Sequence, residues 1–434
     1  MKRREFLKRS MGLAAAAAIP SAMLKADVIP DDGSRPLPLE AVRFDPEIYR
    51  ANDARTILIF LGGGMSDVVA NMTHLSEIVE NDLSQTPYPQ GRLTPTDRNG
   101  FWLEAGGDIL ERCLDEGELT VFRTCYSHLA SASHGLNQKR YCHGNDRGYE
   151  SGIPMTLMHL LHRGGVVGES DMFVNVAIDG GFYKLLQDFS ALSPLPPYLR
   201  PVSFNRDFDN PYEYDRDDRN RVDLGDYKTN EIFNAADFDR RLDALMRRHN
   251  RNDPLAEIFN GRKELSEFVE EAKNRRLPVE YPKTVDGRKL ETAMRILTGN
   301  SSTRFVTILG GHSGWDDHSD AITLHEKRAR ELFEAVEAAM KHMRAEKIDN
   351  INIVLFGDFG RNLNLNSTGG WDHGNNQALL WFGGTRYLRH MKVVGETELE
   401  VRIPKARLYH RPAAGTFEFS PISIAATIYR LYGV

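Results

Sequence analysis

Apolar residues occur along the chain in short continuous runs. The runs are rich in Ile, Leu, Val and Phe, and glycine or polar residues end most of them. They occupy residues 55–61, 118–124, 172–178, 304–309, 351–356 and 378–382. A continuous apolar run of this length is typical of a strand that is buried on both faces. We therefore expect these segments to form one central sheet.

Between these runs, apolar residues recur every three or four positions, which indicates amphipathic helices. The predicted helices cover residues 153–163, 235–250, 254–275, 286–298, 321–346 and 421–431. Buried strands that alternate with helices predict an α/β fold, in which helices cover both faces of a mostly parallel sheet.

One stretch interrupts this alternation. Residues 183–230 contain many prolines, aromatic residues and acids without clear periodicity. We interpret residues 183–300 as an insertion or cap within a single α/β domain that spans residues 27–434.

The first 26 residues have the pattern of an export signal. A basic head with Arg3 and Arg4 is followed by Phe6, Leu7 and Lys8, and then by a short alanine-rich apolar stretch. This pattern is typical of a twin-arginine signal. It predicts the twin-arginine export machinery as a partner and a periplasmic or secreted location. Cleavage after Ala22 and cleavage after Ala26 both remain open.

Composition and charge argue against several classes of protein. The chain has 434 residues, of which 41% are hydrophobic and 27% charged, as in ordinary globular proteins. The net charge is −6, and removal of the predicted signal would take away six basic residues and one acid. An acidic mature chain argues against nucleic-acid binding. No apolar run is long enough for a membrane span. Three cysteines allow at most one internal disulfide, such as Cys125–Cys142, or buried free thiols.

Acidic residues and histidines gather just after the predicted strands. In open α/β sheets, ligands bind beyond the carboxyl ends of the strands. Aspartate and histidine are common ligands of zinc, manganese, magnesium and calcium, and we expect one of these divalent metals as the cofactor. The candidate metal ligands are Asp67, Asp316, His318, Asp358, Asp372 and His373. His134 follows Ser133 in a further glycine-flanked loop and is a candidate catalytic residue.

Several rival motifs fail. The serine-hydrolase elbow G-x-S-x-G is broken by Trp315, and no phosphate-binding loop of the G-x-x-x-x-G-K-[ST] type occurs. No cysteine lies in the C-x-P-x-R motif of formylglycine sulfatases. A nucleotide-dependent or formylglycine-dependent enzyme is therefore not expected.

Five motifs together carry a resemblance. GGGMSD, SASHG, GWDDH, FGDFGRN and GGWDHG resemble an exported bacterial family known as domain of unknown function 1501. That family is similar to the alkaline phosphatase superfamily, which includes sulfatases. The resemblance covers residues 55–180 and 300–434.

The resemblance implies roles for individual residues. It implies that Asp316, His318 and His373 bind a first metal. Asp358 and Asp67 would bind a second, although Phe359 stands where the superfamily has a further histidine ligand. Ser133 resembles the position near the nucleophile, and Arg361 would meet an oxyanion.

Two functions follow from these observations. The first is an exported metal-dependent hydrolase that acts on phosphate or sulfate esters of a small molecule or polysaccharide. The second is a non-catalytic periplasmic or envelope-associated binding protein on the same fold.

Overall fold

The structure is a computed structural model, and its described residues exclude the predicted signal and most of residues 210–266. The described residues are 52–128, 133–145, 151–168, 171–188, 195–209, 265, 267–311, 314–389, 392–402 and 407–433. The predicted helix at 235–250 and the candidate cleavage positions lie outside them.

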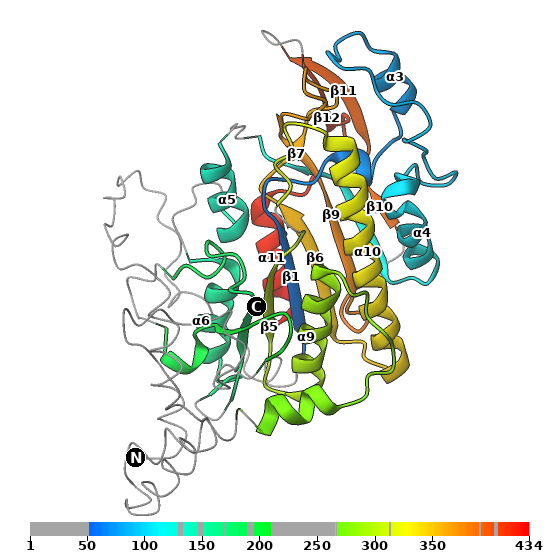
Figure 1. Ribbon diagram of the computed structural model, residues 1–434. Helices are drawn as coiled ribbons and strands as arrows, with labels where there is room; N and C mark the ends of the chain where they lie inside the picture. The colour runs from blue at the N-terminus through cyan, green and yellow to red at the C-terminus, as the bar shows by residue number, and fades with distance from the viewer. Residues whose placement is uncertain are drawn as a thin grey trace, which may run out of the picture.

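A mixed eight-stranded sheet forms the centre of the molecule (Figure 1). Its strands are, in spatial order, β10 (Lys392–Val394), β2 (Leu119–Tyr126), β9 (Asn376–Gly383), β6 (Ile351–Gly357), β1 (Arg55–Leu61), β5 (Phe305–Leu309), β3 (Asn175–Ile178) and β4 (Val202–Phe204). Strand β9 is antiparallel to both of its neighbours, and the other pairings are parallel. The predicted mostly parallel sheet is confirmed.

Helices cover both faces of the sheet, as predicted. Helices α4 (Asp108–Asp115), α9 (Val285–Gly299) and α10 (Ala321–Glu346) share one hydrophobic core with Ile57 and Ile59 of β1. Helices α5 (His134–His143), α6 (Ile153–Arg163) and α11 (Pro421–Leu431) share the other core with Leu58 and Phe60. Successive side chains of a strand point to opposite faces, so β1 contributes to both cores.

Smaller elements complete the described chain. They are a 3₁₀ helix at Asp67–Val69, α3 (Leu75–Glu80), a π-helical turn at Leu103–Gly107, a 3₁₀ helix at Pro197–Leu199, and the pairs β7 (Gly360–Arg361) with β8 (His373–Gly374) and β11 (Thr397–Arg402) with β12 (Arg407–Pro412).

The range interpreted as an insertion or cap contains two described elements that pack with the rest of the domain. Strand β4 lies within residues 183–300 and is the edge strand of the central sheet, paired in parallel with β3. Helix α9 lies in the same range and packs against α10 and the main core. These two described elements thus contribute to the central sheet and its core, and the interpretation of residues 183–300 as an insertion or cap stays a prediction. The sequence did not predict β4, because a strand of three residues is too short to show a periodic pattern.

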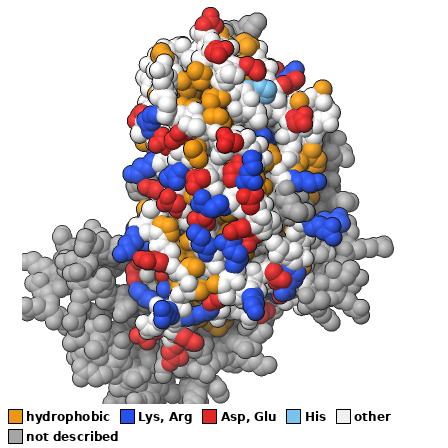
Figure 2. Space-filling model, turned by 90° about the vertical axis from the view of Figure 1, so that its right-hand side faces the viewer, with side chains coloured by type: hydrophobic (Ala, Val, Ile, Leu, Met, Phe, Trp, Pro, Cys, Tyr) orange, Lys and Arg blue, Asp and Glu red, His pale blue; other side chains and the backbone are white. Residues whose placement is uncertain are grey.

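The surface over the helices has mixed charge. On the side of the molecule turned to the viewer in Figure 2, acidic and basic side chains alternate. Across α4 and α10, Arg112 pairs with Glu337 and Arg330 pairs with Asp108. Exposed pairs of this kind contribute about 0–1 kcal/mol each, so the apolar contacts beneath them hold the helices in place.

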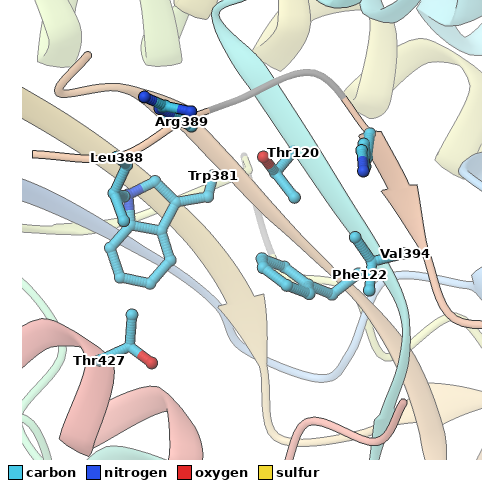
Figure 3. A pocket seen from close by; sticks show the side chains of 8 residues that line it. Thr120, Phe122, Trp381, Leu388, Arg389, Val394 and Thr427 are labelled. Atoms are coloured by element: carbon cyan, nitrogen blue, oxygen red, sulfur yellow. The ribbon is translucent and has the colours of Figure 1, made fainter.

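A hollow lies beside β2, β9 and β10 (Figure 3). It is lined by Thr120, Phe122, Trp381, Leu388, Arg389, Lys392, Val394 and Thr427. Trp381 pairs with Thr120 and Val354 in the middle of the sheet. The hollow therefore lies at the level of mid-sheet and not at the loops that follow the carboxyl ends of β1, β5 and β6.

The cysteines are free thiols. Cys113, Cys125 and Cys142 are all buried and none is paired, so the disulfide that the sequence left open does not form. Among the described helices, none combines the length and the apolar character that crossing a membrane requires.

Candidate metal centre

Loops from neighbouring strands meet at one end of the sheet. Strand β1 lies between β5 and β6, with Phe60 opposite Leu309 and Leu61 opposite Gly357. Gly63 has a φ of +101°, and a Cβ atom at this position would lie 2.5 Å from the backbone nitrogen of Asp316. The close approach of the two loops thus requires the glycine-rich sequence after β1.

Three of the predicted ligands form a compact triangle. The Oδ1 atom of Asp316 lies 3.0 Å from Nε2 of His318 and 3.3 Å from Nε2 of His373. The two histidine nitrogens lie 3.1 Å apart. Ligand atoms about 2.0–2.2 Å from a tetrahedral zinc ion lie about 3.3 Å from one another. The triangle therefore has the dimensions of one face of a metal coordination shell.

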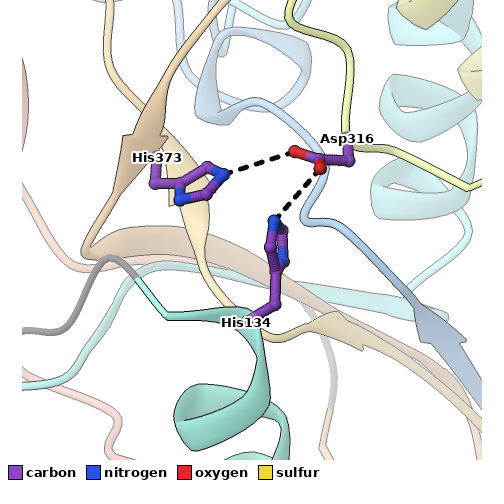
Figure 4. A group of neighbouring side chains, drawn as sticks. All are labelled: His134, Asp316 and His373. Carbon is purple, nitrogen blue, oxygen red and sulfur yellow. Dashed lines mark hydrogen bonds and ion pairs between the residues drawn. The ribbon is translucent and has the colours of Figure 1, made fainter.

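His134 joins this triangle from the start of α5 (Figure 4). Its Nε2 atom lies 3.2 Å from Oδ2 of Asp316, the carboxylate oxygen outside the triangle. Among the described residues, this buried nitrogen has no hydrogen-bond partner, because its contact with Asp316 lacks hydrogen-bond geometry. Ligand atoms of His134, Asp316 and His373 all lie within 4.8 Å of one another. A cation or a proton beside them would relieve the crowding of lone pairs.

Two other predicted ligands orient the histidines instead of entering the triangle. Asp358 is fully buried and its Oδ2 lies 2.6 Å from Nδ1 of His134. Asp372 contacts Nδ1 of His318 at 3.1 Å with one oxygen and the guanidinium of Arg407 with the other. Carboxylates behind metal-binding histidines fix the ring orientation and the tautomer. Both aspartates occupy that supporting position.

Asp67 is not brought into the cluster. It is buried at the start of a 3₁₀ helix, where Asn376 donates to its Oδ2 at 2.6 Å. Nδ1 of His410 lies 3.5 Å from the same oxygen. Burial raises the pKa of the Asp67 carboxyl, and the contacts with His410 and Asn376 offset only part of that effect. The residue belongs to a buried polar group beneath β7.

Arg361 has a different role from the expected oxyanion contact. Its buried guanidinium donates hydrogen bonds to Asp316 at 2.7 Å and to several backbone carbonyls. The carbonyls belong to Gly63, Gly64, Trp315 and Trp371. Burial lowers the pKa of Arg361, although its partnership with Asp316 opposes the shift. The side chain ties the loops of the site together and does not point into solvent.

Residues 209–401 match the family model described as "Protein of unknown function (DUF1501)". This match confirms the resemblance found in the sequence, and it includes Asp316, His318, Asp358 and His373. A search of curated proteins gave no match.

Solved structures with a similar arrangement are distant. The C-terminal periplasmic domain of EcEptC from Escherichia coli, in complex with Zn, is 11% identical, with 88% of this chain and 84% of that chain covered and a TM-score of 0.39. The lipoteichoic acid synthase LtaP from Listeria monocytogenes is 8% identical, with coverages of 91% and 76% and a TM-score of 0.35. BT4656 in complex with D-glucosamine-2-N,6-O-disulfate is 10% identical, with coverages of 88% and 77% and a TM-score of 0.34. At this distance they assign no role to any residue of this chain.

The electrostatics of the site favour a cation. Burial alone would raise the pKa of Asp316, but the hydrogen bond and charge of Arg361, with His134 and His318, hold it at about 2. Asp316 is therefore ionised at neutral pH. Burial alone would lower the pKa of His134, but Asp358 and Asp316 outweigh this effect and raise it. The cluster attracts positive charge, either as protons or as a metal ion.

Phe359 stands beside the histidines. Its buried ring lies 4.6 Å from the ring of His134 and 4.5 Å from that of His373, measured between centroids. The sequence resemblance places a second-metal ligand at this position, and the phenyl ring supplies none. It packs against both imidazoles and restricts their rotation.

Sequence reasoning missed two polar residues next to His134. Gln138 lies one helical turn after His134 in α5, and the buried Lys184 donates a hydrogen bond to Gln138. The i, i+4 spacing of His134 and Gln138 puts them on one helix face and could have indicated the first. Ser133 is exposed and directly precedes α5. Its nucleophilic role stays a prediction.

Proposed function

We propose that this protein is a metal-dependent hydrolase that acts on phosphate or sulfate esters at the centre formed by Asp316, His318 and His373. The observation that carries the proposal is the triangle of ligand atoms at 3.0, 3.1 and 3.3 Å. A carboxylate and two imidazoles form a donor set typical of catalytic zinc sites, in which three protein ligands leave a position for water or substrate.

The residues around the triangle have complementary tasks. A bound divalent cation would polarise an ester oxygen and lower the pKa of a bound water molecule. Asp316 supplies negative charge, and Asp372 and Arg361 hold the ligands in place. His134 contacts the Asp316 oxygen outside the triangle, which suits transfer of a proton beside the metal. The attacking oxygen would come from water or from Ser133, the residue before His134.

The proposed substrate is an exported ester. The predicted twin-arginine signal would place the protein in the periplasm or outside the cell, where phosphorylated or sulfated small molecules and polysaccharides would be its substrates. The donor set is compatible with zinc, manganese, magnesium and calcium, and these four cations are the candidates.

Metal analysis and a substrate panel test the proposal. Chelator-treated protein would be reloaded with each of the four cations, and bound metal would be counted by elemental analysis. The nitrophenyl phosphate and sulfate esters, and phosphorylated and sulfated oligosaccharides, would be the substrates. We expect one metal per chain and hydrolysis of at least one ester class. Protein that retains no metal and hydrolyses nothing under any of the four conditions would contradict the proposal.

Matched variants locate the site. Asp316→Asn and His373→Ala should lose the metal and the activity together, because each removes a corner of the triangle. His128→Ala is the control, because His128 is exposed and pairs with Glu418. Ser133→Ala separates the two nucleophiles, since activity that survives it requires attack by water.

A second function is favoured by Phe359. A phenyl ring in place of a ligand, packed on both His134 and His373, is compatible with a centre that binds an ester without turning it over. In that case the protein would bind one metal and a sulfated or phosphorylated polysaccharide, measured by calorimetry, while the substrate panel shows no hydrolysis.

A further inference from the structure

A chain of hydrogen bonds leads from a buried lysine to the metal centre. Lys184 is 6% exposed, and its Nζ atom donates to Oε1 of Gln138 at 2.6 Å and to the backbone oxygen of Gly135 at 3.3 Å. Nε2 of Gln138 then donates to Oδ2 of Asp358 at 3.2 Å. Asp358 in turn holds His134. The proposed chemistry uses neither Lys184 nor Gln138.

The direction of each bond in this chain is fixed by chemistry. A lysine ammonium can only donate, so the oxygen of the Gln138 amide must face Lys184. The amide nitrogen must then face Asp358, to which it donates. An amide turned the other way would bring its NH₂ group to the ammonium and its oxygen to the carboxylate. A donor would then face a donor at one end, and an acceptor would face an acceptor at the other.

Asp358 is thereby held from three sides. Its Oδ1 accepts a hydrogen bond from the backbone nitrogen of Gly63 at 2.9 Å, and its Oδ2 contacts Gln138 and His134. A carboxylate accepts hydrogen bonds, so the neutral ring of His134 carries its proton on Nδ1. That tautomer leaves the lone pair of Nε2 directed at the centre.

We infer that Gln138 and Lys184 are positioning residues, which lock Asp358 so that His134 presents an unprotonated Nε2 to the metal centre. The inference rests on the proposed function for its purpose, but its geometry concerns the metal-free chain. Among the described residues, the buried ammonium of Lys184 donates to two neutral oxygens. Burial of an ammonium without an acidic partner is unfavourable, which indicates that this network serves a purpose.

Two substitutions interrupt the chain at different points. Gln138→Leu removes the amide, and Lys184→Met keeps the length of the side chain while removing the ammonium. Lys184→Arg is the conservative variant, which retains a buried donor. Lys139→Met is the matched control, because Lys139 is exposed on the neighbouring position of α5. Asp358→Asn is the positive control.

Nitrogen-15 NMR of the histidine rings gives a readout in metal-free protein. At pH 9 we expect wild-type His134 to carry a slowly exchanging proton on Nδ1. Gln138→Leu and Lys184→Met should speed the exchange of this proton at least tenfold, whereas Lys139→Met leaves it unchanged and Lys184→Arg restores it. A loss of global stability alone would speed exchange of core amides as well, which serves as an internal control.

The affinity for zinc gives a second readout. Loss of a group that orients a metal-site histidine typically weakens affinity about 10–100-fold. Because Gln138 and Lys184 act in series, the double variant should be no weaker than the worse single variant. If wild-type protein binds no zinc, the proposed function fails while the ring-proton result still decides this inference. An unchanged His134 ring proton in both folded single variants would overturn it.

Discussion

Arg361 provides a strong test of how the site is built. Its guanidinium lies among the loops that carry the triangle, and among the described residues its one acidic hydrogen-bond partner is Asp316. Its other partners are four backbone carbonyl oxygens. Methionine replaces the aliphatic part of the arginine side chain but has no hydrogen-bond donor.

The size of the effect follows from the partners that are left behind. A buried acceptor without a donor costs about 1–3 kcal/mol. Four carbonyl oxygens at the lower limit give about 4 kcal/mol, and methionine recovers part of this by apolar contact. The lost ion pair with Asp316 adds less than the about 3–5 kcal/mol of a fully buried pair, because the Asp316 side chain is 46% exposed. We therefore expect Arg361→Met to lower the free energy of unfolding by about 3–5 kcal/mol.

Urea denaturation of metal-free protein measures this difference. The urea concentration at the midpoint of unfolding should fall. The slope of the unfolding free energy against urea should stay the same, since the surface exposed on unfolding does not change. Arg411→Met is the matched control, because Arg411 is half-exposed and pairs with Glu398. Its expected effect is below about 1 kcal/mol. A loss below about 1 kcal/mol in Arg361→Met would refute the reasoning, because it would mean that the guanidinium does not hold the loops.

Three further predictions concern backbone space, pH and thiols. Gly370→Ala should destabilise the fold by about 1–3 kcal/mol in urea denaturation and weaken zinc binding, because its Cβ would lie 1.9 Å from the carbonyl carbon of His318. Gly168→Ala, which meets no atom within 4 Å, should change stability by less than about 0.5 kcal/mol. Burial raises the pKa of Glu118 to about 7 despite Arg344, so the folded chain holds a proton that the unfolded chain releases above about pH 4.5. Its contribution to stability should therefore fall as the pH rises from 4.5 to 7, and Glu118→Gln should flatten that part of the stability curve. A disulfide reagent that labels thiols should react with none of the cysteines in native protein and with all of them in denaturant, because burial raises the pKa values of the thiols in the folded chain. The thiols are Cys113, Cys125 and Cys142.

The sequence was sufficient for the central elements because their burial imposes a pattern. Strand β1 is apolar throughout its inner residues, since it has cores on both sides. Helix α11 begins with Ser420, whose hydroxyl accepts from the backbone nitrogen of Ser423, and with Pro421 in its first turn. The beginning of α11 could therefore be predicted from the sequence. Strands β4 and β10 have three residues each and lie at the edges of the sheet, where neither length nor burial imposes such a pattern.

The site was predictable in its location and only partly in its roles. Aspartates and histidines after parallel strands must meet at one edge of the sheet, and Asp316, His318 and His373 do so. Spacing along the chain does not show which oxygen faces the centre. The supporting position of Asp358 depends on His134, which comes from a helix far away in the sequence. The inward direction of Arg361 depends on carbonyl groups that are present in any sequence.

The arrangement around the triangle argues for one metal ion in place of two. The two aspartates that the resemblance assigns to a second metal are both engaged by the protein. Asp358 accepts from Gly63, Gln138 and His134, and Asp67 is buried against Asn376 and His410. A second divalent cation would have to displace these partners in a buried region, where Phe359 offers no ligand. Asp316, by contrast, is partly exposed and ionised, with a pKa of about 2, although its Oδ1 also accepts a hydrogen bond from Arg361. The negative charge available to a cation is thus concentrated at Asp316, and we expect elemental analysis to find one metal per chain.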